Sequence, residues 1–305
     1  MADIYILGSL NMDLVVYLNR YPQKGETIKG HSFRTGAGGK GLNQAIAASK
    51  LGGHVHFLGA VGHDIFGEAM KKQLLTYGVD IASVKTREDI SSGVALIEVC
   101  QGENEIALDL GANETISASE IAAFFAEAKP DDIFLTQGEN NLAAMEKSLQ
   151  KAHEIGLTTI LNPAPANGGM KRCFGVVDYL TPNETEAALL TGSPRIEEAG
   201  PRFGVPHVII TLGGKGYYDY SAEESYQQNA IKVDVVDTTG AGDAFCGAFA
   251  NFLAENISRK DALHLASIYA SLKTTRKGSS AAMPTREEFK DFLTKNEARL
   301  ASLIA

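Results

Sequence analysis

The sequence has no tryptophan, only three cysteines and no long apolar run. The cysteines, Cys100, Cys173 and Cys246, are far apart and form no CxxC pair, so neither a disulfide framework nor a structural zinc site is indicated. No segment approaches the ~18 apolar residues that a membrane-spanning helix needs, and the first nine residues lack the pattern of a signal peptide. We therefore expect a reduced, cytoplasmic protein with no membrane partner.

Clusters of basic residues are also absent. The net charge is −9, from 28 Lys and Arg against 37 Asp and Glu, which argues against a broad nucleic-acid surface. A small phosphorylated ligand is still compatible with this charge, because a local anion site needs only backbone N–H groups and one or two cations. We expect small-molecule ligands and no nucleic acid.

Short apolar runs alternate with helical patterns through most of the 305 residues, which predicts a mainly parallel sheet. The exceptions are two extended segments, at about 13–36 and 91–111, that have no helix between their strands. They predict a small sheet added to the main one. We expect an α/β fold, a doubly wound and mainly parallel sheet with helices on both faces, and one domain over residues 1–305.

Polar or glycine-rich turns follow the predicted strands of the main sheet. In open α/β sheets, ligands bind at the carboxyl ends of the strands. Five such turns, at 8–13, 136–141, 161–166, 181–186 and 211–216, therefore predict one large polar site.

The glycine-rich stretch "GAGGKG" at 36–41 matches GxGxxG by count only. A dinucleotide fingerprint directly follows the first strand, which here continues into "GSLNMD", and Gly41 stands where a Walker A loop has Ser or Thr. We interpret the stretch instead as a ligand cradle, in which Gly38 and Gly39 allow close approach of the backbone.

Two pairs of polar side chains flank this cradle. Lys40 and Asn43 share one face at the start of a helix, and Asn11 and Asp13 point the same way in an extended chain. Together they offer the donors and acceptors that a polyhydroxylated ligand requires. The alternative is a capping turn at Asn11 and Asp13 and a solvated Lys40.

The segment "DTTGAGDAF" at 237–245 places Asp243 behind Gly240, Ala241 and Gly242, at the start of a helical pattern. A glycine-rich turn into a helix N-terminus is a ready anion hole. We hypothesise that a phosphoryl group passes between this hole and Asp243, which would accept the proton of an attacking hydroxyl. In the alternative interpretation, Asp243 only caps the helix.

The segment "TPNETE" at 181–186 also has two interpretations. Asn183 and Glu186 are three residues apart at a helix start, which describes a capping box. The functional alternative is an acid that organises water around Mg²⁺, because this ion usually keeps several waters.

These motifs resemble those of the ribokinase-like (PfkB) carbohydrate kinases. The stretches "GSLNMD", "GGKGLNQA", "TPNETE", "ITLGGKG" and "DTTGAGDAF" occur in that family's order and spacing over nearly the whole chain, and "LNPAP" and "TRKG" are most similar to the ribokinases within it. The resemblance implies a β lid made by the two extended segments and ATP-dependent phosphorylation of a pentose, ribose first. Another small sugar (deoxyribose, fructose or a sugar acid) and a non-catalytic sugar or nucleotide sensor remain alternatives.

The resemblance also assigns roles to individual residues. Asp243 would be the catalytic base, and the anion hole would comprise Gly240, Ala241 and Gly242. The sugar would bind to Asn11, Asp13, Gly39, Lys40, Asn43, Glu139 and Asp243. ATP would bind to Asn183, Thr211, Gly213, Gly216, Gly242 and Ser267, with Mg²⁺ near Glu186 through water. An activating K⁺ would bind to Asp237, Thr239, Lys273, Arg276 and Gly278, mostly through backbone carbonyls. The lid would pair two subunits into a homodimer.

Three positions depart from the ribokinase pattern. The segment 193–207 is short and contains three prolines, which predicts a trimmed helix. Gly138 precedes Glu139 where a bulkier residue is usual, and this bears on the fit of the sugar. Ala282 stands where ribokinases commonly have a serine near the cation, which bears on cation dependence.

Overall fold

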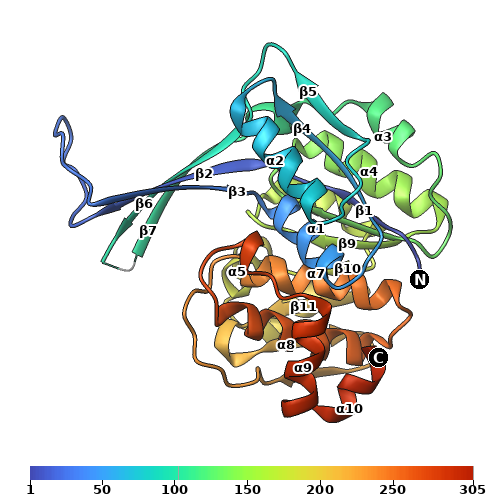
Figure 1. Cartoon of the computed structure of the whole chain (residues 1–305). Coiled ribbons are helices and arrows are strands. Elements are labelled where there is room, and N and C mark those ends of the chain that lie inside the picture. Colours follow the sequence, from blue (N-terminus) through green and yellow to red (C-terminus); the bar gives the residue numbers. More distant parts are fainter. Residues whose placement is uncertain (102, 305) are drawn as a thin grey trace.

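The computed structural model describes residues 1–101 and 103–304. A nine-stranded sheet forms the centre of the molecule, and a separate four-stranded sheet projects from it (Figure 1). The predicted α/β fold with a mainly parallel sheet is confirmed. No helix in the described ranges is long and apolar enough to cross a membrane.

The main sheet has the strand order β13-β12-β11-β10-β9-β8-β1-β4-β5. From β5 to β11 the neighbouring strands are parallel, whereas β12 and β13 pair antiparallel at one edge. The strands are β1 (Ile4–Leu7), β4 (Val55–Gly62), β5 (Val84–Arg87), β8 (Ile133–Gln137), β9 (Thr158–Asn162), β10 (Tyr179–Leu180), β11 (His207–Thr211), β12 (Tyr217–Ser221) and β13 (Ser225–Gln228). The sequence did not predict the β12–β13 hairpin, since its tyrosines and glutamines lack a clear apolar alternation.

Alternate residues of β1 belong to two different cores, which places helices on both faces of the sheet. Ile4 and Ile6 join one core, and Tyr5 and Leu7 join the other. The first core is covered by α1 (Lys40–Lys50), α2 (Ile65–Thr76), α7 (Ala241–Ala254), α8 (Arg259–Thr274), α9 (Arg286–Asn296) and α10 (Ala298–Ala301). The second is covered by α3 (Ala118–Phe124), α4 (Leu142–Ile155), α5 (Glu184–Thr191) and α6 (Ile196–Arg202).

The smaller sheet, called the lid below, has the order β3-β2-β6-β7. It consists of β2 (Asn11–Leu18), β3 (Ser32–Gly38), β6 (Gly93–Cys100) and β7 (Glu103–Asp109), and it extends well away from the main sheet in Figure 1. Both extended segments predicted from the sequence contribute to it, although Gly102 lies outside the described residues. Because β2 continues directly from the end of β1, the lid begins at the carboxyl edge of the main sheet.

Two helical segments can be compared in detail with the sequence pattern. The helical pattern after residue 285 divides into α9 and α10. The short segment at 193–207 keeps a seven-residue helix, α6, with Pro201 inside it, in agreement with the predicted trimming.

Candidate active site

Glu139 connects the polar turns at the carboxyl edge of the main sheet. Its Oε2 accepts hydrogen bonds from Ser9 Oγ at 2.6 Å, Asn11 Nδ2 at 3.2 Å and the Lys40 backbone N–H at 3.0 Å. These partners come from the turn after β1, the start of β2 and the start of α1. The peptide at Gly39, with a φ of +91°, turns the chain from β3 into α1 and is favourable only for glycine.

Asp243 lies in the first turn of α7 and is buried. Its Oδ2 accepts a hydrogen bond from Asn43 Nδ2 at 2.9 Å, and its Oδ1 accepts one from Gln44 Nε2 at 3.1 Å. Helix α7 begins after Gly240, which has a φ of +72° and offers no side-chain cap. The carboxylate of Asp243 is therefore directed to α1 and makes no capping hydrogen bond within its own helix.

Three carboxyl groups and one ammonium group share this site. Burial, followed by the charges of Glu139 and Asp243, raises the pKa of Asp13 to about 7. Burial also raises the pKa of Asp243, and Lys40 is the largest opposing influence. Burial alone would lower the pKa of Lys40, but the surrounding carboxylates, Asp243 first, raise it. The ammonium of Lys40 thus compensates an otherwise repulsive cluster.

Asn43 has one more polar atom directed into this region. Its Oδ1 is buried and has no hydrogen-bond partner in the described parts of the chain. A buried acceptor without a partner is costly. A ligand hydroxyl would satisfy it.

One of the three amides predicted to form the anion hole already has a hydrogen-bond partner. The Ala241 N–H already donates to Thr238 O at 3.0 Å. The first bond within α7 runs from the Ala244 N–H to Gly240 O at 2.9 Å, so helix geometry supplies no partner for the amides of Gly242 and Asp243. These two N–H groups are the donors that α7 can offer to an anion.

A cavity of about 670 Å³ lies beside this helix start. Of the six residues predicted to bind ATP, five line it: Thr211, Gly213, Gly216, Gly242 and Ser267. Asn183 is not in its wall but forms a β-bridge with Thr211. The sequence did not indicate the wall formed by 230–235, which has no glycine or charge pattern to mark it.

Asn183 and Glu186 form a reciprocal capping box at the start of α5. The Asn183 N–H donates to Glu186 Oε2, and the Glu186 N–H donates to Asn183 Oδ1, both at 2.8 Å. Burial raises the pKa of Glu186, the hydrogen bond from Asn183 and the charge of Lys40 lower it, and Asp243 raises it. The capping interpretation is confirmed, and the same carboxylate also interacts electrostatically with the active-site cluster.

The residues predicted to bind K⁺ do not fit an ion in this structure. Asp237 Oδ1 accepts the Thr239 N–H at 2.9 Å, and Oδ2 accepts the Gly278 N–H at 2.8 Å. The ammonium of Lys273 donates to the carbonyls of Asp237, at 3.2 Å, and of Thr239.

One further predicted ligand also has a partner. The Lys273 carbonyl accepts the Arg276 N–H at 3.1 Å. Ala282 is buried and has no side-chain oxygen. Most of the oxygens proposed for K⁺ are therefore already hydrogen-bonded within the protein.

Sequence reasoning missed several residues that support the site. Gln44 also donates to Asn162 Oδ1 at 3.2 Å and accepts from Gln137 Nε2 at 2.7 Å. Asn113 Nδ2 donates to Asn11 Oδ1 at 2.9 Å. Ser9 and Gln44 lie inside the motifs "GSLNMD" and "GGKGLNQA", so the motifs contained a signal for them; nothing in the local sequence marks Asn113.

Comparison with known proteins gives a consistent result. Residues 1–286 match the family model "pfkB family carbohydrate kinase". The chain is 40% identical to the ribokinase of Schizosaccharomyces pombe over 304 residues, covering 93% of this chain and 96% of the relative. It is 34% identical to the deoxyribokinase of Salmonella typhi over 305 residues, covering 97% and 100%. The structure of Arabidopsis thaliana ribokinase complexed with ribose and ATP superposes with a TM-score of 0.87 at 31% identity, covering 96% and 98%.

Proposed function

Because the chain belongs to the PfkB family of carbohydrate kinases, we propose that it transfers the γ-phosphoryl group of ATP to the primary hydroxyl of ribose, forming ribose 5-phosphate. The observation that carries this proposal is the position of Asp243. Its buried carboxylate accepts hydrogen bonds from Asn43 and Gln44, and the residue before it, Gly242, lines the cavity. A relative with this fold has been solved with ribose and ATP.

Asp243 would act as the general base. It would accept the proton of the primary hydroxyl while the hydroxyl oxygen attacks the γ-phosphorus. The bond from that phosphorus to the bridging oxygen breaks, and ADP leaves. The amides of Gly242 and Asp243, at the positive end of α7, would stabilise charge on the transferred group.

The sugar would bind above α1. There, the unpartnered Asn43 Oδ1 and the carboxyl groups of Asp13 and Glu139 can accept hydrogen bonds from sugar hydroxyls. Asn11, Lys40 and the Gly39 backbone complete the proposed sugar set. A site that pairs each sugar hydroxyl with a buried polar group discriminates strongly against a sugar that lacks one. We place ribose ahead of deoxyribose because ribose offers one more hydroxyl to these polar groups; a relative at 34% identity is a deoxyribokinase.

Glu186 is suited to a magnesium ion that arrives with the nucleotide. Its chemistry fits, because a carboxylate can hold a water of a hard cation while its other oxygen caps α5. When bound, Mg²⁺ would neutralise charge on the phosphate oxygens.

The sugar is tested by ADP release measured over ribose, deoxyribose, fructose and a sugar acid, each compared with a reaction without sugar. We expect kcat/KM to be highest for ribose. A higher kcat/KM for another sugar would support kinase activity but contradict ribose as the substrate. ADP release that no sugar of the panel accelerates would favour a sugar or nucleotide sensor.

The lid would cover the bound sugar and exclude water from the γ-phosphate. Its strand β2 carries both Asn11 and Asp13, so movement of the lid is coupled to sugar contacts. We also propose that two lids associate to form a homodimer. The support is the apolar surface that Ile106 and Leu108 expose on β7.

A further inference from the structure

Lys273 lies where a monovalent cation would be expected. It is fully buried at the end of α8, with 0% of its surface exposed. Its ammonium donates to the backbone carbonyls of Asp237 and Thr239, which directly precede the glycine turn of α7. A buried lysine without such partners would be strongly disfavoured.

An ammonium group can replace a bound monovalent ion at this position. It carries the same unit charge, and its three N–H donors match carbonyl oxygens. The carboxylate of Asp237, held by the amides of Thr239 and Gly278, provides the neighbouring negative charge. Hydrogen bonds from the Lys273 ammonium and to the Asp237 carboxylate therefore both fix the loop that precedes α7.

We propose that the side chain of Lys273 is a built-in cation that positions the anion-hole loop and makes the kinase independent of K⁺. Lys273 is a positioning residue, because it contacts the loop and not the substrates. This differs from the K⁺ site suggested by family resemblance, since the protein's own ammonium uses the carbonyls that the ion would need.

The first test compares the wild-type protein in KCl and in tetramethylammonium chloride at equal ionic strength. We expect equal kcat values and equal midpoints of thermal unfolding in the two salts. The second readout reports cation binding even without turnover. A rise of either quantity in KCl would overturn the proposal.

The second test is Lys273→Met, which keeps most of the side-chain volume and removes the charge. We expect kcat in tetramethylammonium chloride to fall about 10²-fold, the cost of misplacing catalytic groups, with little change in the KM for sugar. Addition of K⁺ should restore part of kcat and raise the unfolding midpoint of the variant.

Lys50 provides the matched control. Its ammonium also donates to two backbone carbonyls, of Ala281 at 3.2 Å and Met283 at 2.7 Å, but these do not belong to the glycine loop. Lys50→Met should lower stability without creating any response to K⁺. An equal K⁺ response in both variants would contradict a specific role for Lys273, and so would its absence in Lys273→Met.

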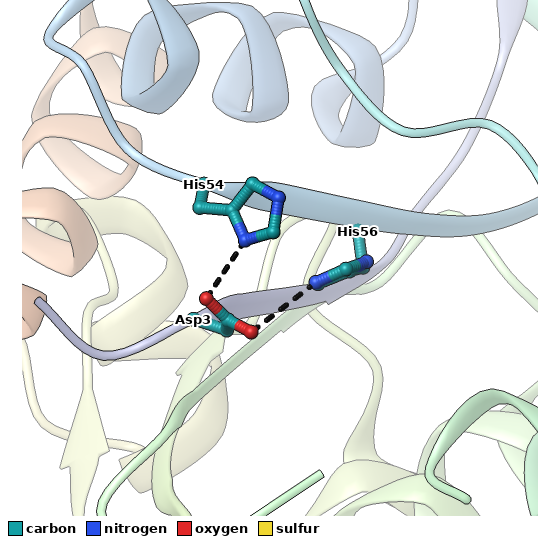
Figure 2. Close-up of side chains that lie close together, drawn as sticks. All are labelled: Asp3, His54 and His56. Carbon is teal, nitrogen blue, oxygen red and sulfur yellow. Dashed lines mark hydrogen bonds and ion pairs between the residues drawn. The ribbon is translucent and has the colours of Figure 1, made fainter. Parts of the chain in front are cut away.

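A second and independent feature lies at the opposite edge of the main sheet. Asp3 directly precedes β1, and His54 and His56 lie at the start of β4 (Figure 2). His54 Nδ1 is 2.8 Å from Asp3 Oδ1, and His56 Nε2 is 3.5 Å from Asp3 Oδ2. One ligand atom from each residue lies within 4.8 Å of the others.

Asp80 orients the ring of His56. His56 Nδ1 is 2.9 Å from Asp80 Oδ2, so the carboxylate holds the proton on Nδ1. The lone pair of Nε2 then faces the carboxylate of Asp3, and Nε2 is buried without a hydrogen-bond partner in the described residues. A metal cation between these two acceptors, 3.5 Å apart, would satisfy both of them, as a second proton on the ring would.

From this geometry we infer a binding site for a divalent transition-metal ion of the zinc class. Its ligands are His54 Nδ1, His56 Nε2 and an oxygen of Asp3, with Asp80 behind His56. Two imidazoles and one carboxylate suit Zn²⁺ better than Mg²⁺. The fourth position is left to water.

Isothermal titration of the full chain, free of any added histidine tag, tests this site with ZnCl2 and with MgCl2. We expect one Zn²⁺ per chain from this cluster, at least about 10-fold weaker binding in His54→Ala and in His56→Ala, and no such loss for Mg²⁺. His63→Ala is the control, since the ring of His63 pairs with Glu88, at 2.8 Å, and is not part of the cluster. No Zn²⁺ binding, or equal binding in all variants, would overturn the inference.

Discussion

At the residue scale, Asp243 shows how one position can be read both as a helix cap and as a catalytic group. It occupies the third position of α7, as Asp261 does in α8. Asp261 lies near its own cap, Ser258, whereas both oxygens of Asp243 are bonded to side chains of α1. The two aspartates have the same local position and different environments.

Replacing Asp243 with Asn should remove the base and preserve the shape of the site. We expect kcat to fall by ~10²–10⁴, the usual contribution of general-base catalysis, with little change in sugar affinity. Steady-state kinetics and sugar titration measure the two quantities. Asp261→Asn is the matched control and should keep wild-type kcat. If Asp243→Asn retained more than half of kcat, its catalytic role would be lost.

Asp13 should make sugar use depend on pH. Burial, Glu139 and Asp243 raise its pKa to about 7 in the free protein. Below that pH the carboxyl group is protonated and is a weaker acceptor for sugar hydroxyls, so kcat/KM for the sugar should rise as pH increases through about 7.

The variant Asp13→Asn separates this effect from other titrations. It should lose the rise near pH 7 and weaken sugar binding by roughly 1.5–3 kcal/mol, the value of a hydrogen bond to a charged group. Nucleotide affinity measured without sugar should stay constant. An unchanged pH profile in Asp13→Asn would assign the inflection to another group.

At the element scale, the start of α5 tests whether Glu186 does more than cap. Glu186→Gln should preserve the capping box, because Gln serves in that position as well as Glu. Helix stability should then be unchanged. Loss of the charge should raise the Mg²⁺ concentration needed for half-maximal activity and lower kcat. Asn183→Ala is the complementary variant and should cost about 1 kcal/mol of stability. If Glu186→Gln kept the kcat and the Mg²⁺ requirement of the wild type, the role of Glu186 would be limited to capping α5.

The elements show where sequence reasoning succeeds. Strands such as β4 and β8, with their glycine-rich or polar ends, were predictable because apolar runs and turn residues are local signals. The β12–β13 hairpin was missed, since its side chains fit a sheet only through pairing with β11.

Some residues of the candidate site could likewise be predicted from the sequence, and others could not. Asp243, Asn43 and Glu139 lie in recognisable motifs, so their types could be predicted, and the fold brings them together. The contact of the Lys273 ammonium with the carbonyls of Asp237 and Thr239 could not be predicted, because it depends on the direction of one side chain. Family resemblance suggested a backbone carbonyl there, whereas the structure uses the ammonium.

At the scale of the whole molecule, the lid is the part of the fold that the main core does not explain. It projects beyond the main sheet (Figure 1), and apolar side chains remain exposed on it, with Ile106 at 57% and Leu108 at 39%. Projecting apolar surface is typical of an interface. Ile106 and Leu108 share one face of β7, and the strand register places Leu108 across from Ala95, which is paired with Asp13. The face that carries Asp13 thus continues outward as apolar surface.

We expect this face to hold a second copy of the chain, so the protein should elute with twice the 32.5 kDa of one chain in size-exclusion chromatography with light scattering. Ile106→Lys should shift the mass to that of a monomer, because a charge would be buried without a partner. It should also raise the KM for sugar, since the lid carries Asp13 and would lose its support. Ile65→Lys is the control, because Ile65 is 80% exposed on α2 and does not belong to the lid strands. A wild-type monomer, or a dimer that Ile106→Lys leaves intact, would show that the two lids do not associate through this face.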